Sequence, residues 1–77
     1  EFSVYPNPFE NQLTISFSEL INSSYSVTIQ NALGQVVYQF QPSNQSSNID
    51  LTSFDSGVYF VNIKNSKGTQ TVRIIKQ

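Results

Sequence analysis

Apolar and polar residues alternate along most of this chain, which is the period of a β-strand with one buried face. The clearest run is 13–17, where Leu, Ile and Phe alternate with Thr and Ser. No segment keeps apolar residues at helical spacing for long enough to predict a helix. The same alternation predicts further strands at 3–5, 25–29, 36–40, 49–51, 59–63 and 72–74.

Turn-forming residues separate these runs. Asn31–Gly34 and Asn65–Gly68 each end in a glycine, which adopts positive φ easily, so both predict tight hairpins. The segment 41–48 is rich in Ser, Asn and Gln and predicts a long polar loop or a crossover between sheets. Several short strands with regular turn signals favour an antiparallel β-sandwich over a parallel α/β sheet.

The buried face should carry every second residue of each strand. If Tyr59 and Ile63 point inward, then Val58 and Phe60 point outward, and Ile75 joins them on that outer face. A covering loop or a bound partner would explain these extra apolar residues, and isolated surface apolar residues are common enough to favour the loop. The residues expected inside are Leu13, Ile15, Phe17, Tyr25, Val27, Ile29, Val36, Tyr38, Phe40, Ile49, Leu51, Tyr59, Val61, Ile63, Val72 and Ile74.

The composition limits the chemistry. The 77 residues, 38% of them hydrophobic, are enough for one small core, so we expect a single domain over 1–77. With no Cys and no His, neither a Ser/His or Cys/His nucleophile nor a Cys/His zinc site can form. Asp50 is better explained by the polar face of a strand, and Asp55 by a turn, than either is by paired-carboxylate catalysis. The three glycines stand singly and no calcium-loop spacing occurs, so we expect no cofactor and no enzyme.

Charge is unevenly distributed although the net charge is only −1. All four cations follow residue 63, and all five acidic residues precede them. Cations on an edge strand discourage aggregation, so this pattern fits either a solvated edge or a docking surface. Nucleic acid is not expected as a partner, because the overall balance is not basic. The longest apolar runs, of two or three residues, are far below the roughly 20 that a membrane-spanning helix needs, and we expect no N-terminal export signal within 1–77.

Two functions without catalysis follow from the sandwich alone. Aromatic rings stack on sugars, so Tyr5, Tyr25, Tyr38 and Tyr59 leave open a carbohydrate-binding accessory domain. A mechanical spacer is the other. An exposed edge strand would also let two copies form a weak edge-joined or domain-swapped homodimer.

An ordered set of motifs resembles the C-terminal sorting domain, type A, of type IX secretion cargo from Bacteroidota. It begins with the Tyr5, Pro6, Asn7, Pro8 motif and ends in a basic, apolar tail at 72–76, so it covers nearly the whole chain. The motifs between them are Leu13-Thr14-Ile15, Val27-Thr28-Ile29-Gln30-Asn31, Gly34-Gln35-Val36-Val37, Ile49-Asp50-Leu51 and Gly57-Val58-Tyr59-Phe60-Val61.

The resemblance implies a small seven-stranded Ig-like sandwich at the end of a larger secreted precursor. Such a domain directs upstream cargo through the periplasm and the outer-membrane translocon to the surface or the medium. A sortase-like surface protease then removes it, and many cargos become linked to a lipopolysaccharide anchor. The cleavage region would lie at or before residue 1. The partner-recognition candidates are Lys64, Lys67, Arg73, Lys76, Gly57, Tyr59 and Phe60.

Overall fold

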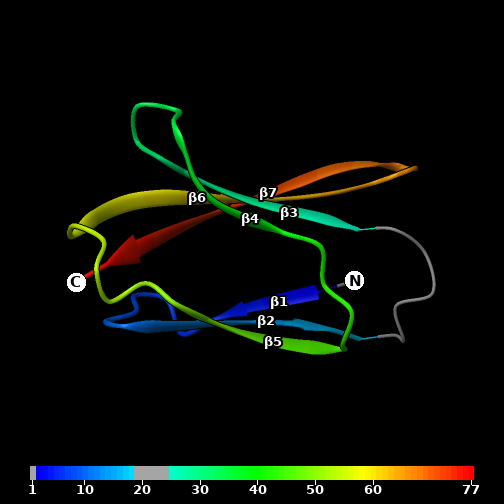
Figure 1. Ribbon diagram of the computed structural model, residues 1–77, viewed down its shortest axis with the longest axis horizontal. Helices are drawn as coiled ribbons and strands as arrows, with labels where there is room; N and C mark the ends of the chain where they lie inside the picture. Colours follow the sequence, from blue (N-terminus) through cyan, green and yellow to red (C-terminus); the bar gives the residue numbers. More distant parts are fainter. Residues whose placement is uncertain (1, 19–24) are drawn as a thin grey trace.

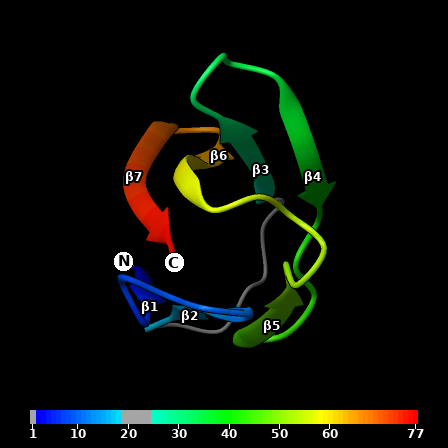
Figure 2. The same ribbon diagram turned by 90° about the vertical axis from the view of Figure 1, so that its left-hand side faces the viewer.

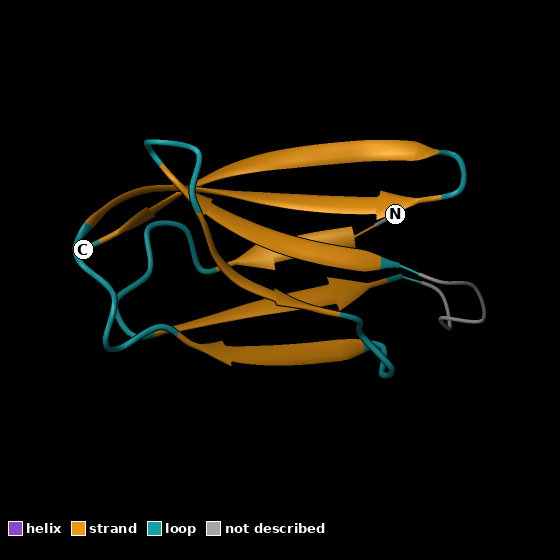
Figure 3. Cartoon of the chain, turned by 45° about the horizontal axis from the view of Figure 1, so that its top comes forward, coloured by secondary structure: helices purple, strands orange, loops and turns teal. Residues whose placement is uncertain are grey.

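Seven β-strands make up the fold in the computed structural model, which describes residues 2–18 and 25–77 (Figures 1 and 3). No helix occurs among the described residues. The strands are β1 (Phe2–Tyr5), β2 (Gln12–Phe17), β3 (Ser26–Asn31), β4 (Val36–Phe40), β5 (Ser46–Asp50), β6 (Gly57–Asn65) and β7 (Gly68–Lys76).

The strands form two sheets that face each other across one core (Figure 2). One sheet has the order β1-β2-β5 and the other β4-β3-β6-β7. Every pair of neighbouring strands is antiparallel. The predicted seven-stranded antiparallel sandwich is therefore confirmed, with β7 as an edge of the larger sheet.

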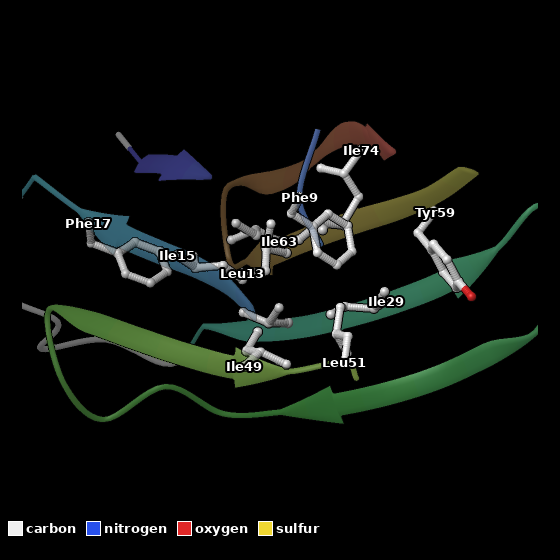
Figure 4. Packing of buried hydrophobic residues seen from close by; sticks show 12 residues of the cluster. Phe9, Leu13, Ile15, Phe17, Ile29, Ile49, Leu51, Tyr59, Ile63 and Ile74 are labelled. Carbon is white, nitrogen blue, oxygen red and sulfur yellow. The ribbon is translucent and has the colours of Figure 1, made fainter. Parts of the chain in front are cut away.

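The core lies where the inner faces of the two sheets meet (Figure 4). Alternation in β2, β3 and β6 places every second residue inside, as predicted. Phe9, which lies in no predicted strand, is also buried there, with only 1% of its surface exposed. The buried set is Phe9, Leu13, Ile15, Phe17, Val27, Ile29, Ile49, Leu51, Tyr59, Val61, Ile63 and Ile74.

The prediction for β4 is confirmed at Phe40, which packs against the core, and wrong at Val36, which is 51% exposed while Val37 packs against the core. Tyr38 is in phase with Phe40 but is 38% exposed. A register shift in the β3–β4 pairing, between Ile29 and Gln30, accounts for the changed phase at Val36. A bulge of this kind inserts one extra residue, which reverses the side-chain alternation on one side of it.

The loop predicted over 41–48 is shorter in the structure, because β5 already begins at Ser46. Ser46–Asn48 pairs with β2, and the Thr14 hydroxyl donates to Asn48 Oδ1 at 2.7 Å. An edge strand with one exposed face can be polar, so hydrophobicity alone did not reveal it.

The outward apolar residues of the larger sheet need no covering loop. Val58 is opposite Ile75, and Phe60 lies between Gln30 and Arg73 on the neighbouring strands. Cross-strand neighbours of this kind shelter one another, and all three apolar side chains are half-buried.

Candidate recognition surface

The β6–β7 hairpin carries two of the predicted cations at its tip. Lys64 is opposite Thr69 near the end of β6, and Lys67 lies in the turn, both with exposed side chains. The turn is fixed by Asn65, whose Oδ1 accepts a hydrogen bond from the Lys67 N–H at 2.9 Å. The predicted tight hairpin is thus confirmed, and it projects both ammonium groups into solvent.

The three acidic residues that the structure describes lie at the other end of the sandwich. Glu10 follows Phe9, which bridges to the far end of β7, and Asp55 precedes the start of β6. Asp50 is paired with Gln12, where β2 begins. The start of β6 and Lys64 are seven residues apart, or about 23 Å at the strand rise. Within the described residues, the sandwich is therefore acidic at one end and basic at the hairpin tip.

Arg73 and Phe60 lie together on the outer face of the larger sheet. They are directly opposite in the β6–β7 pairing, with Arg73 exposed and Phe60 half-buried. The aliphatic stem of an arginine can cover an aromatic ring while its guanidinium stays in water. Both residues are thus on a surface that a partner could contact.

Lys76 differs from the other three cations. It is opposite Gly57 and bridges to Phe9, and only 7% of its surface is exposed. The sequence grouped Lys76 with an exposed basic tail, but tertiary packing encloses the last residues of β7 on both sides. We therefore leave it out of the contact surface proposed below.

The N-terminal motif closes the opposite side of β7. Asn7 Nδ2–H donates to the Arg73 carbonyl at 3.1 Å, and Asn7 Oδ1 accepts from the Ile75 N–H at 3.1 Å. The Phe9 N–H then donates to the Ile75 carbonyl at 2.9 Å, and the Gln77 N–H donates to the Phe9 carbonyl at 2.8 Å. We call residues 6–9 the strap, because they cross from β1 to the free edge of β7.

Two of the four strap residues are prolines, Pro6 and Pro8. The Tyr5-Pro6 and Asn7-Pro8 peptide bonds are both cis, and Tyr5, Pro6, Asn7 and Pro8 are all exposed. Proline has no N–H to lose, so a strap rich in proline leaves few unpaired donors. The N-terminal motif of the family resemblance therefore has a clear structural role, with Phe9 as its buried anchor.

Gly57 and Tyr59 form a corner where the chain passes from one sheet to the other. Gly57 has φ of 148°, a conformation that side chains disfavour, although a Cβ there would meet no atom within 4 Å. The Tyr59 hydroxyl donates to the Asp55 carbonyl at 2.6 Å, four residues upstream. Burial, and then the Asp55 carboxylate, raise the pKa of Tyr59. This geometry matches the tyrosine corner of Ig-like sandwiches.

The carboxylates show no catalytic arrangement among the described residues. Asp50 Oδ1 accepts hydrogen bonds from the hydroxyl and the N–H of Thr52, which lower the pKa of Asp50. This contact holds the turn after β5, and Asp50 itself is the exposed last residue of that strand, as its predicted place on a polar strand face requires. In the described part of the chain, no group of three or more potential metal ligands lies together. Nor does it contain a helix long and apolar enough to cross a membrane.

The sequence missed the strap, although it carried a partial signal for it. Two prolines spaced by one residue forbid a regular strand, and an apolar Phe9 directly after them needs a place to be buried. The sequence did not reveal what the strap binds, because the β7 residues that Asn7 contacts are 66 and 68 residues away.

These features define an Ig-like sandwich that displays a basic hairpin tip. The model of the secretion system C-terminal sorting domain family matches residues 3–77. The chain belongs to this family, which serves type IX secretion, so its class of function is that of a C-terminal sorting signal. Such a tail implies contact with the type IX machinery and export to the surface or the medium.

Two solved structures support the fold. PorZ, described as an essential bacterial surface component of the type-IX secretion system of Porphyromonas gingivalis, is 24% identical with a TM-score of 0.74. The match covers 99% of this chain but only 11% of PorZ. A DUF3244 family protein from Bacteroides vulgatus, with an immunoglobulin-like β-sandwich fold, is 18% identical with a TM-score of 0.83 over 99% of this chain and 84% of that one. A comparison with curated proteins found no match.

Proposed function

We propose that this domain is the address label of a larger cargo protein and that the type IX translocon reads its β6–β7 hairpin. The observation that carries the proposal is the exposed basic tip, Lys64 and Lys67, on a rigid hairpin, with the described acidic residues at the other end. A separated charge pattern steers an acidic receptor toward one end of the molecule. Arg73 and Phe60 extend this surface along the outer face.

Gly57 and Tyr59 support recognition indirectly under this proposal. Both hold the corner from which β6 starts, so they position the hairpin, whereas the buried Tyr59 ring offers little surface to a receptor. The strap has a similar role for β7. A receptor can contact only what the fold displays, and here that is the hairpin tip and the outer face.

The experiment is export of a periplasmic reporter fused upstream of this domain in a type IX host. Deleting 64–77 would be a poor test, because it removes Ile74 from the core and unfolds the domain. The Lys64→Gln/Lys67→Gln double variant instead removes only the basic tip. We expect the reporter to accumulate in the periplasm.

A matched variant controls for loss of charge as such. Glu10→Gln/Asp55→Asn changes two exposed charges at the opposite end, and we expect normal export. If the lysine variant folds and is exported like the parent, recognition through the hairpin tip is wrong. If a reporter without any of residues 1–77 is exported equally well, the sorting function itself is wrong.

Removal by a surface protease is a second part of the proposal. The pairing of Phe2 with Phe17 places the start of β1 inside a sheet, which favours cleavage before the folded strand. Mass spectrometry of the exported reporter should find a new C-terminus upstream of residue 2. A reporter that retains Phe2–Gln77 after export would contradict removal.

The carbohydrate-binding alternative receives less support from the positions of the tyrosines. Tyr59 is buried, Tyr25 packs on Phe17 with ring centroids 4.9 Å apart, and the more exposed Tyr5 and Tyr38 belong to different sheets. A sugar platform needs rings that share one face. We therefore propose no second function.

A further inference from the structure

The outer edge of β7 is divided into a closed half and an open half. Ile75 and Gln77 direct their main-chain groups away from β6, toward the strap. Because this direction alternates along a strand, Arg73, Thr71 and Thr69 direct theirs to the same side. Among the described residues, the strap contacts this edge only from the Arg73 carbonyl onward. The N–H groups of Thr69, Thr71 and Arg73 therefore point away from β6, on a side where no described strand pairs with β7.

The strap shows what this edge can bind. Phe9 lies beside Lys76 as a parallel bridge, so extended backbone already adds to the closed half of β7. The open half presents the same main-chain pattern over 69–73 without a neighbour from the described residues. A strand of a partner protein that pairs here would continue the larger sheet by one strand.

Charge decides the kind of strand that fits. Lys67 lies at one end of the open half, Arg73 at the other, and Lys64 is opposite Thr69 on the same face. A second copy of this chain, paired edge to edge, would bring both sets of cations along one seam, which is unfavourable. An extended segment with carboxylates avoids that repulsion and gains charge-assisted contacts. A homodimer would have to use another edge, such as β4.

From these observations we propose that the open half of β7, Thr69–Arg73, binds an acidic extended segment of a partner protein as an added β-strand. This inference rests on the proposed function, because it names how the receptor would read the hairpin. The strap sets one limit of the site and the Asn65–Gly68 turn sets the other. The partner's backbone would supply affinity, and its carboxylates would select the basic edge.

The test is a titration of the folded domain with a short blocked peptide that alternates valine with glutamate, followed by amide NMR. We expect the largest shifts, and about ten-fold slower amide exchange, at Thr69 and Thr71. The same peptide with glutamine in place of glutamate should bind at least about five-fold more weakly. No change at these amides with millimolar peptide, or equal binding of the two peptides, overturns the proposal.

Backbone pairing is tested separately from charge. Two forms of the glutamate peptide carry N-methyl groups on alternate amides, so one form blocks the nitrogens that face the edge and the other blocks those that face away. One form should lose binding and the other should keep it. If both bind like the parent peptide, the contact is electrostatic only and strand addition is wrong.

A protein variant provides the matching control. Thr71→Pro removes a main-chain N–H that does not bond to β6, and Thr71→Val keeps that N–H. Both variants lose the 2.7 Å hydrogen bond that the Thr71 hydroxyl donates to Asn62 Oδ1, so they differ in the N–H. Peptide affinity should fall about ten-fold in the proline variant relative to the valine variant. Should the proline variant fail to fold, the two methylated peptides still decide the question.

The export assay separates this inference from the proposed function. Suppose the reporter with Thr71→Pro is exported normally while the Lys64→Gln/Lys67→Gln reporter is retained in the periplasm. The sorting function is then supported, and binding of the receptor as an added strand is contradicted. If the peptide binds as expected but no hairpin variant affects export, the binding site on the β7 edge is supported and its role in sorting is contradicted.

Discussion

The two halves of β7 face different surroundings although they belong to one strand. The half that ends at Lys76 is held by β6 on one side and by the strap on the other, and its side chains Ile74 and Lys76 are buried. The half that starts at Gly68 pairs only with β6 among the described strands, and its side chains are exposed through Thr71. One half stabilises the fold, and the other is available to a partner.

This difference shows how a small domain can keep an open edge without losing stability. An unpaired edge is an aggregation hazard, which cations and short exposed stretches reduce. Here the strap covers the apolar half, and the half left open is polar and flanked by Lys67 and Arg73. Changes in the closed half should therefore affect stability, and changes in the open half should affect recognition.

The largest expected effect comes from removing the anchor of the strap. Phe9→Ala leaves a cavity between the sheets and should lower the free energy of unfolding by about 3–5 kcal/mol. Urea denaturation measures this loss. Leu33→Ala, at a side chain that is 85% exposed, is the control and should change stability by less than about 0.5 kcal/mol. Equal effects of the two substitutions would mean that Phe9 does not anchor the strap.

A smaller loss is expected when the strap loses its polar contacts with β7. Asn7→Ala removes both side-chain hydrogen bonds, to the Arg73 carbonyl and from the Ile75 N–H, at a cost of about 1–2 kcal/mol. Amide exchange at Ile75 should become faster, while exchange at Val61 in the centre of the sheet follows global unfolding only. If exchange at Ile75 is unchanged, these two bonds do not hold the closed half.

The corner below the hairpin should contribute a similar or slightly smaller amount. Tyr59→Phe removes the hydrogen bond to the Asp55 carbonyl and should cost about 1 kcal/mol at neutral pH.

The raised pKa of Tyr59 adds a pH dependence with a definite sign. Because the folded pKa lies above that of the unfolded chain, about 10, this contribution is complete below that pH and is lost as the pH rises further. The stability difference between wild type and Tyr59→Phe should therefore shrink in alkaline solution. A difference that stays constant to high pH would contradict this account.

The smallest effect on stability is expected at the hairpin tip. Lys64→Gln/Lys67→Gln should change the free energy of unfolding by less than about 0.5 kcal/mol, because both side chains are exposed. Thermal denaturation measures this, and the same variant should show the largest loss of export. Marked destabilisation would contradict the claim that the open half of β7 and the hairpin tip beside it contribute little to stability.

The local pattern of the sequence determined much of the fold. Alternation predicted the strands because a half-buried strand imposes a period of two on its residues, as in β2 and β6. Asn and Gly marked the hairpins, since turns need residues that tolerate positive φ. The absence of His and Cys limited the chemistry in the same direct way. The exposed cations Lys64, Lys67 and Arg73 could also be predicted, but not how they are arranged around an edge.

Only the tertiary structure decided which distant segments meet. The bulge that turns Val36 outward depends on the pairing of β4 with β3. The polar residues of β5 form a strand because they pair with β2. Lys76 looked like part of an exposed tail, yet it is buried because Phe9 reaches it from the other end of the chain. Contacts between residues so far apart leave no periodic signal, so the division of β7 into a closed and an open half became visible only in the folded molecule.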